Sequence, residues 1–268
     1  MARSGRVTEW DARVYNRISA LQHWLAEKSL ASLTLNGDER VLDVGCGDGT
    51  ISAEIARRLP RGSVLGVDAS HAMVTFAIER FPGTTHPNLA FRVADAASLD
   101  VGDRFDLIVS FNCLHWVRDQ AAALRGIRAA LAPSGRTHLR LVPQGRRRSL
   151  EDVIEDAVST PPWAAFFHDH RPPYLHLTPD AYRALAERCG LRTERLDVQQ
   201  ETWDFGTRAE FAHFAEVTFV EWTKSIPAPR HEAFINDVLD RYRQVDDGSS
   251  SHADVFTFYQ MEVVLRPA

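Results

Sequence analysis

The sequence has few cysteines and no long apolar run. Its three cysteines, Cys46, Cys113 and Cys189, are widely separated and follow neither metal-ligand spacing nor a pairing pattern, which is typical of a reducing cytosol. No apolar segment approaches the length of a membrane span, and the N-terminus lacks the apolar core of a signal peptide. We therefore expect a soluble, cytoplasmic protein without a metal site or a membrane partner.

A long basic run is also absent. The formal net charge is −5, and the one basic cluster, Arg146–Arg148, is interpreted as a solvated loop, so a general nucleic-acid-binding face is not expected. With 268 residues and 44% hydrophobic content, the chain can bury one substantial core and an appended subdomain. We expect a single catalytic unit, whose oligomeric state the sequence does not reveal.

The most informative stretch is 41–50, with the sequence VLDVGCGDGT. Its apolar start predicts a buried strand, and glycines at positions 45, 47 and 49 let the backbone turn sharply and pass close to a ligand. Apolar residues then recur every four positions, which predicts a helix that ends before Pro60. This succession indicates a nucleotide-cofactor site, although a tight turn in any α/β sheet could use the same residues.

The glycine spacing argues against a dinucleotide. The pyrophosphate-binding pattern G-x-G-x-x-G requires glycine at position 50, where this chain has Thr50. Asp43 and Asp48 also place two carboxylates at the turn, which would repel phosphates and suit a positively charged ligand. An NAD-linked oxidoreductase is therefore disfavoured.

Two more carboxylates follow predicted strands. Asp68 ends the apolar segment 63–68, where a carboxylate can accept both ribose hydroxyls of a nucleotide, or can stabilise a helix dipole. Ser70 is predicted to cap the helix that follows. Asp95 follows a predicted strand at 89–93, a position where Asp is commonly a turn former.

Strands and helices alternate through the rest of the chain. This order predicts an α/β fold with a doubly wound parallel sheet and a ligand at its carboxyl edge. Aromatic-rich helices between 203 and 245 must cover an apolar surface, either the sheet edge or a substrate pocket. The other expected strands are 105–111, 137–142, 191–198 and an antiparallel 255–265; the other expected helices are 119–131, 150–159 and 178–188; and polar residues 246–251 are expected to form a loop.

Together these features resemble the class I, Rossmann-like S-adenosylmethionine-dependent methyltransferases over residues 20–265. The glycine turn is similar to that family's first motif. More narrowly, Trp10, Tyr15 and Gln22 before the turn, and Leu114-His115-Trp116 after it, resemble the branch containing trans-aconitate and juvenile hormone acid methyltransferases, which methylate carboxylates. The resemblance implies a seven-stranded, mostly parallel sheet with its last strand antiparallel, a helical cap, and S-adenosyl-L-methionine as cofactor.

The resemblance also implies a set of cofactor residues. Some would lie around the methionyl end, at the turn and near the backbone of Phe111, and others would hold the ribose and the adenine. The residues expected around the methionyl end are Asp43, Gly45, Cys46, Gly47 and Asn112. Those expected around the ribose and adenine, called the adenosyl residues, are Asp68, Ala69, Met73, Asp95 and Ala96.

The acceptor is expected to be a small molecule, most simply a carboxylic acid. Gln22 and Trp116 match positions that orient a substrate carboxylate in relatives; otherwise the first is a solvated helix residue and the second a core aromatic. A carboxylate is ionised at neutral pH and needs no general base. A hydroxyl, amine or carbon acceptor would need one, and His115 is the nearest candidate, followed by the more distant His168 and His170.

An acid with three carboxylates, such as trans-aconitate, would require fixed cations. Arg140, Arg146–Arg148 and Arg171 are the candidates, whereas the aromatic-rich segments would equally suit a largely apolar acid. A protein that binds S-adenosylmethionine without catalysis is a further alternative.

The expected organisation has three parts. Residues 1–38 would form an N-terminal helical lid, and residues 39–200 and 251–268 the Rossmann-like core. Residues 201–250 would form a helical cap inserted before the last strand. Closure of the lid and the cap over the ligands would exclude water from the site.

Overall fold

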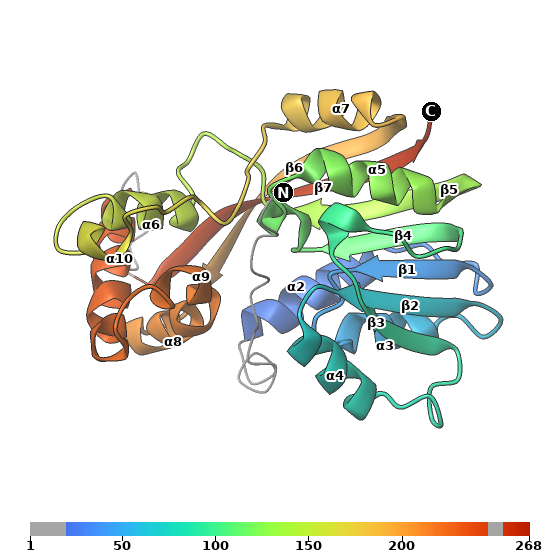
Figure 1. The fold of residues 1–268 in the computed structure, drawn as a ribbon, viewed down its shortest axis with the longest axis horizontal. Helices are drawn as coiled ribbons and strands as arrows, with labels where there is room; N and C mark the ends of the chain where they lie inside the picture. Colours follow the sequence, from blue (N-terminus) through green and yellow to red (C-terminus); the bar gives the residue numbers. More distant parts are fainter. Residues whose placement is uncertain (1–19, 246–253) are drawn as a thin grey trace.

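The computed structural model describes residues 20–245 and 254–268, apart from the side chains of residues 20, 22 and 23. Two parts lie side by side in Figure 1: a twisted sheet flanked by helices on the right and a helical half on the left. The predictions for Trp10, Tyr15 and the 246–251 loop concern residues outside the described ranges.

The described strands form one seven-stranded sheet in the order β3-β2-β1-β4-β5-β7-β6. β7 pairs antiparallel with β5 and β6, and the other pairs are parallel, so the predicted fold class is confirmed. The order reverses between β1 and β4, at the switch point where doubly wound sheets bind ligands. The strands are β1 Arg40–Val44, β2 Ser63–Asp68, β3 Leu89–Val93, β4 Phe105–Phe111, β5 Leu131–Leu141, β6 Leu191–Asp204 and β7 Val255–Pro267.

Helix α4 begins at the predicted Ser70 cap, and α7 has a cap of the same kind at Thr178. Ser70 Oγ accepts a hydrogen bond from the Met73 N–H, and Thr178 Oγ1 accepts one from the Ala181 N–H, both at 3.2 Å. The α-helices are α2 Ala20–Ala31, α3 Thr50–Arg57, α4 His71–Arg80, α5 Gln120–Ala130, α6 Leu150–Val158, α7 Pro179–Arg188, α8 Arg208–Thr218, α9 Val220–Thr223 and α10 His231–Val245; the short 3₁₀ helices are η1 Ala96–Ser98, η2 Leu114–Trp116, η3 Ala164–Phe166 and η4 Ala228–Arg230.

The two faces of the sheet bury different helices. Successive residues of a strand point to opposite faces, so Leu42 packs in one cluster with α5 and α7, whereas Val41 packs in another with α2 and α3. Both side chains are fully buried. Helices on both faces explain why the central strands are almost continuously apolar.

The helical half has its own aromatic core. Residues of α6, α8, α9 and α10 share one buried cluster, in which Trp222 is fully buried and donates its indole N–H to Glu155 at 2.8 Å. Leu21 of α2 belongs to the same cluster. The division into lid, core and cap stays a proposal, with α6 placed in the cap rather than the core because it packs against α10.

Two strand boundaries differ from the prediction. β6 extends to Asp204 rather than position 198, because it pairs with β7 along its whole length. Its exposed outer residues lack the alternation that would have indicated a strand. β5 begins at Leu131, which pairs with Phe105, rather than at position 137, and the register of this pair shifts between Phe105 and Leu107.

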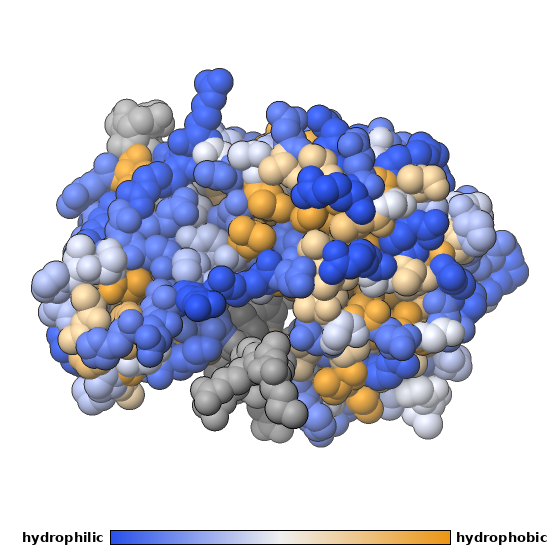
Figure 2. All heavy atoms as spheres, turned by 45° about the horizontal axis from the view of Figure 1, so that its top comes forward, coloured by the Kyte–Doolittle hydropathy of each residue, from blue (hydrophilic) through white to orange (hydrophobic). Residues whose placement is uncertain are grey.

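On the face shown in Figure 2, hydrophobic residues lie in small separate groups among hydrophilic ones. Among the described residues, no helix has both the length and the apolar content needed to cross a bilayer.

Candidate active site

A cavity of about 250 Å³ lies where the sheet edge meets the helical half. The turn after β1 and the end of β4 form one side of the cavity, and α6, α8, α9 and β7 form the other. One face of α2 completes the wall, through Leu21, Leu25, Ala26 and Ser29. The cavity therefore coincides with the switch point of the sheet.

The glycines at the turn have distinct roles. Gly45 and Gly47 both have positive φ angles, of 81° and 53°. A Cβ at Gly45 would overlap the side chain of Cys113, whereas a Cβ at Gly47 would meet no atom within 4 Å. Since Gly47 also lines the cavity, its backbone borders space that a ligand can occupy.

Asp68 connects the glycine turn to the carboxyl end of β2. Its carboxylate accepts hydrogen bonds from the Gly47 N–H at 3.0 Å and the Ser70 N–H at 2.9 Å. A carboxylate oxygen can in general accept more than one hydrogen bond. Ala69 and the buried Ala96 follow β2 and β3 at this edge, and exposed Asp95 accepts from the Ala97 N–H at 2.9 Å.

These positions agree only in part with the predicted cofactor set. Gly45, Cys46, Gly47 and Asn112 line the cavity. Asp68 is not part of the cavity wall, but it accepts a hydrogen bond from the wall residue Gly47. The other predicted residues outside the wall are Asp43, Ala69, Met73, Asp95 and Ala96. The roles of all the predicted cofactor residues, those at the methionyl end included, stay predictions.

Asp43 is buried beneath the turn rather than facing the cavity. It is 2% exposed, and Ser52 of α3 donates its hydroxyl to the carboxylate at 2.5 Å. Burial raises the pKa of Asp43 to about 7, the Ser52 hydrogen bond opposes that rise, and the nearby charge of Asp68 adds to it. Asp43 therefore holds the base of the turn to α3.

Replacing Asp43 should change the pH dependence of stability. The folded protein keeps this proton up to about pH 7, whereas the unfolded chain releases it near the ordinary pKa of 3.8, so stability falls as pH rises between these values. The Asp43→Asn variant does not lose stability in this way. Its free energy of unfolding relative to the parent should therefore rise by about 2 to 3 kcal/mol from about pH 5 to about pH 8. Urea unfolding at both pH values measures the change, and a difference independent of pH would contradict it.

Asn112 and Gln260 form a polar group in the wall. Asn112 has a φ of 55°, and its Oδ1 accepts from the Gln260 amide at 3.0 Å. Gln260 Oε1 is buried without a hydrogen-bond partner among the described residues, so a ligand donor such as an ammonium group would satisfy it. Sequence reasoning missed this residue, although Phe256, Phe258 and Gln260 alternate along one face of β7 and all line the cavity.

His115 is held as a neutral hydrogen-bond donor. Its pKa is well below 6.5 because the ring is buried and His176 lies nearby. The Val142 N–H donates to Nδ1 at 3.4 Å, which leaves the proton of the neutral ring on Nε2. His115 and Trp116 both line the cavity, and Trp116 meets Trp222 edge to face with 6.0 Å between ring centroids.

Gln22 remains a prediction. Its backbone belongs to α2, next to the cavity-lining Leu21, but its side chain is outside the described part of the chain.

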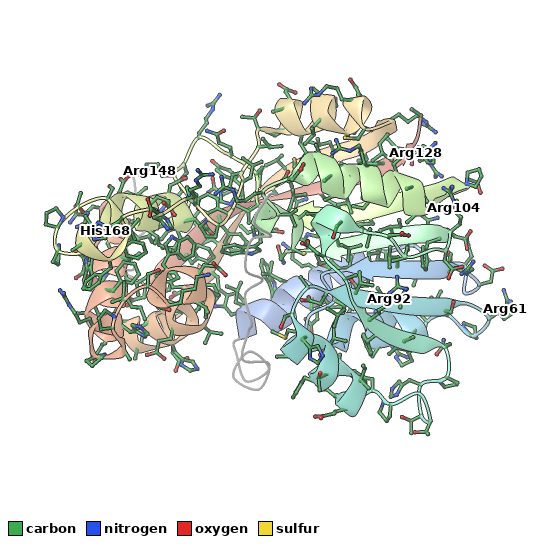
Figure 3. The ribbon with its side chains drawn as sticks, in the orientation of Figure 1. Arg61, Arg92, Arg104, Arg128, Arg148 and His168 are labelled. Carbon is green, nitrogen blue, oxygen red and sulfur yellow. The ribbon has the colours of Figure 1, made fainter. Side chains whose placement is uncertain are left out.

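None of the candidate arginines lines the cavity itself, although Arg147 and Arg148 border an adjoining hollow that shares Glu151 with it. Arg140 is buried and donates to Ser29 Oγ at 3.3 Å, and Arg148 pairs with Asp156 at 2.6 Å. Arg171 lines a separate hollow with His168 and His170, and Figure 3 shows His168 at the far left end of the helical half. None of the described residues that line the cavity is Arg or Lys.

The sheet order, the glycine turn and its carboxylates together define a Rossmann-like cofactor-binding enzyme fold. Residues 41–135 match the family model described as a methyltransferase domain. Malonyl-[acyl-carrier protein] O-methyltransferase of Geobacter sulfurreducens is 31% identical over 190 residues, covering 70% of this chain and 69% of that protein. The chain belongs to the S-adenosylmethionine-dependent methyltransferases.

Other relatives agree with this assignment. Trans-aconitate 2-methyltransferase of Methylobacterium radiotolerans is 31% identical over 163 residues, which span 61% of this chain and 60% of the relative. Juvenile hormone acid O-methyltransferase of Drosophila melanogaster is 25% identical over 217 residues, spanning 76% and 71%. A phosphoethanolamine N-methyltransferase from Haemonchus contortus, solved with S-adenosylhomocysteine, shares the fold at a TM-score of 0.60 and 17% identity, over 93% of this chain and 53% of that one.

The cofactor is therefore S-adenosylmethionine, and the residues present fit it. Gly47 leaves room for a ligand against bare backbone, and the unpartnered Gln260 Oε1 suits the ammonium of the methionyl group. The carboxylate of Asp68 suits ribose hydroxyls beside the same turn.

Proposed function

We propose that this enzyme transfers a methyl group to the carboxylate of a small, largely apolar acid. The observation that carries the proposal is the composition of the cavity wall, which joins aromatic and aliphatic side chains to neutral donors. The names of the relatives, which refer to acids and to a malonyl group, support it.

The cofactor supplies a methyl group on a positively charged sulfur. The protein's task is then to hold one carboxylate oxygen in line with that carbon and to keep water away. Trp116 and His115 offer N–H donors for the carboxylate, and Gln22 is assigned the same role by resemblance. Leu21 and Leu25 of α2 shield the site.

A mechanism with a histidine base is less well supported. His115 carries its proton on Nε2, and its Nδ1 lone pair is taken by Val142, so it has no free nitrogen with which to accept a proton. His168 is exposed in a different hollow. A single anion near a sulfonium needs only neutral donors, whereas an acid with three carboxylates would need cations that the described wall does not provide.

Labelled-methyl transfer to a panel of small acids, phenols and amines tests the proposal. We expect methyl esters of apolar monoacids, with a rate that stays flat between about pH 6 and about pH 9, because a carboxylate is already ionised there. His115→Ala should lower that rate about tenfold through loss of a donor, without adding or removing an inflection. Methylation of only phenols or amines, or an inflection near neutrality that His115→Ala abolishes, would refute it.

A further inference from the structure

Glu151 is an unpaired carboxylate in the wall of the cavity. The other charged side chain there, Asp48, pairs with Arg80 at 2.9 Å. Glu151 forms no hydrogen bond or ion pair with any other residue in the described ranges, although it is only partly exposed. It is therefore the charged group of the described wall that no other described side chain pairs with, although Arg147 and Arg148 line an adjoining hollow that Glu151 also borders.

The other acidic residues of α6 all have partners. Asp152 accepts from the Tyr174 hydroxyl at 3.1 Å, Glu155 accepts from the Trp222 indole at 2.8 Å, and Asp156 pairs with Arg148 at 2.6 Å. Asp152 and Glu155 thereby attach α6 to Tyr174 and Trp222, whereas Asp156 pairs with the residue just before the α6 N-cap. Glu151 contributes to none of these contacts.

The position of Glu151 in the first turn of α6 explains why a carboxylate is favoured there, but not why its side chain borders the cavity. A carboxylate in the first turn is favoured by the helix dipole, and such a residue normally faces water. Here the neighbours Leu150 and Ile154 line the cavity together with Glu151, and so do the rings of Phe256 and Phe258. An anion beside apolar rings is costly unless a donor pairs with it.

We propose that Glu151 determines acceptor specificity by accepting a hydrogen bond from a hydroxyl or amine group of the acceptor. This inference rests on the proposed function, because it concerns a group other than the carboxylate that is methylated. Glu151 comes from α6 in the helical half, whereas Gly45 and Gly47 come from the sheet edge, so the acceptor would extend from one half to the other (Figure 1). A second carboxylate at that end would be repelled.

Three matched acids test the inference on the enzyme saturated with S-adenosylhomocysteine. The probes are 3-phenylpropionate, 3-(4-hydroxyphenyl)propionate and 3-(4-carboxyphenyl)propionate, and their affinities are measured by calorimetry. The parent enzyme should prefer the hydroxylated acid over the dicarboxylic acid. Glu151→Gln should reduce that preference about tenfold, because a charge-assisted hydrogen bond becomes a neutral one and the repulsion disappears.

Two more variants sharpen the result. Glu151→Lys should reverse the preference, and Glu187→Gln, the same change at an exposed site on α7, should leave it unchanged. An equal preference in the parent and Glu151→Gln, or no binding of the hydroxylated acid to the parent, would overturn the inference. If binding changes as expected but no acid is methylated, the inference holds and the proposed carboxylate chemistry fails.

Discussion

Gly47→Ala should lower the affinity for S-adenosylhomocysteine by about 10- to 100-fold while leaving the protein folded. The added methyl group meets no protein atom within 4 Å, so it would enter the space that the structure leaves open beside the turn. Filling that space costs about as much as overpacking a protein core, roughly 1 to 3 kcal/mol. Calorimetric titration measures the loss.

Gly102→Ala is the matched control for that variant. Gly102 also has a positive φ, of 70°, and an equally open surrounding, but it is outside the cavity wall. Both substitutions carry the same backbone cost, about 1 to 2 kcal/mol. If Gly47→Ala and Gly102→Ala bind the ligand equally well, the turn does not carry the cofactor.

Gly45→Ala should instead destabilise the fold, by about 2 to 4 kcal/mol. A Cβ there would overlap both Cβ and Sγ of Cys113, and the φ of 81° disfavours any other residue. Urea unfolding measures the free energy directly. Any loss of ligand binding should follow the loss of folded protein.

A double variant separates the steric cost of Gly45→Ala from its backbone cost. Gly45→Ala combined with Cys113→Gly removes both overlapping atoms and should recover the steric part, leaving about 1 to 2 kcal/mol of backbone cost. Cys113→Ala should recover less, because Cβ remains. A Gly45→Ala protein as stable as the parent would show that Cys113 does not pack tightly against the turn.

The glycine turn could be predicted from sequence because its information is local. A strand, a helix start and the positive-φ positions all lie within residues 41–50, and the predicted boundaries of β4 were confirmed for the same reason. Glu151 could not be predicted as a site residue, because its direction depends on how α6 packs against α10. Gln260 could be predicted only in part. The sequence shows its alternation with Phe258, but not the pairing of its amide with Asn112.

The outer part of β6 shows a second limit. Residues after 198 form a strand only because each finds a partner on β7, more than fifty positions later in the chain, as in Thr202 opposite Thr257. A strand stabilised by distant backbone pairing leaves little trace in its own side chains. Local patterns therefore predicted β2 and β4 better than the outer part of β6.

Helix α2 joins the two ends of the cavity. Leu21 packs into the aromatic cluster of the helical half, Leu30 packs against the sheet, and Ser29 lies between them at the wall. A ligand that displaces α2 at one end of the cavity would therefore alter the wall at the other end. Any such linkage between cofactor and acceptor would be reciprocal, because the factor by which one ligand changes the affinity for the other is the same in both directions.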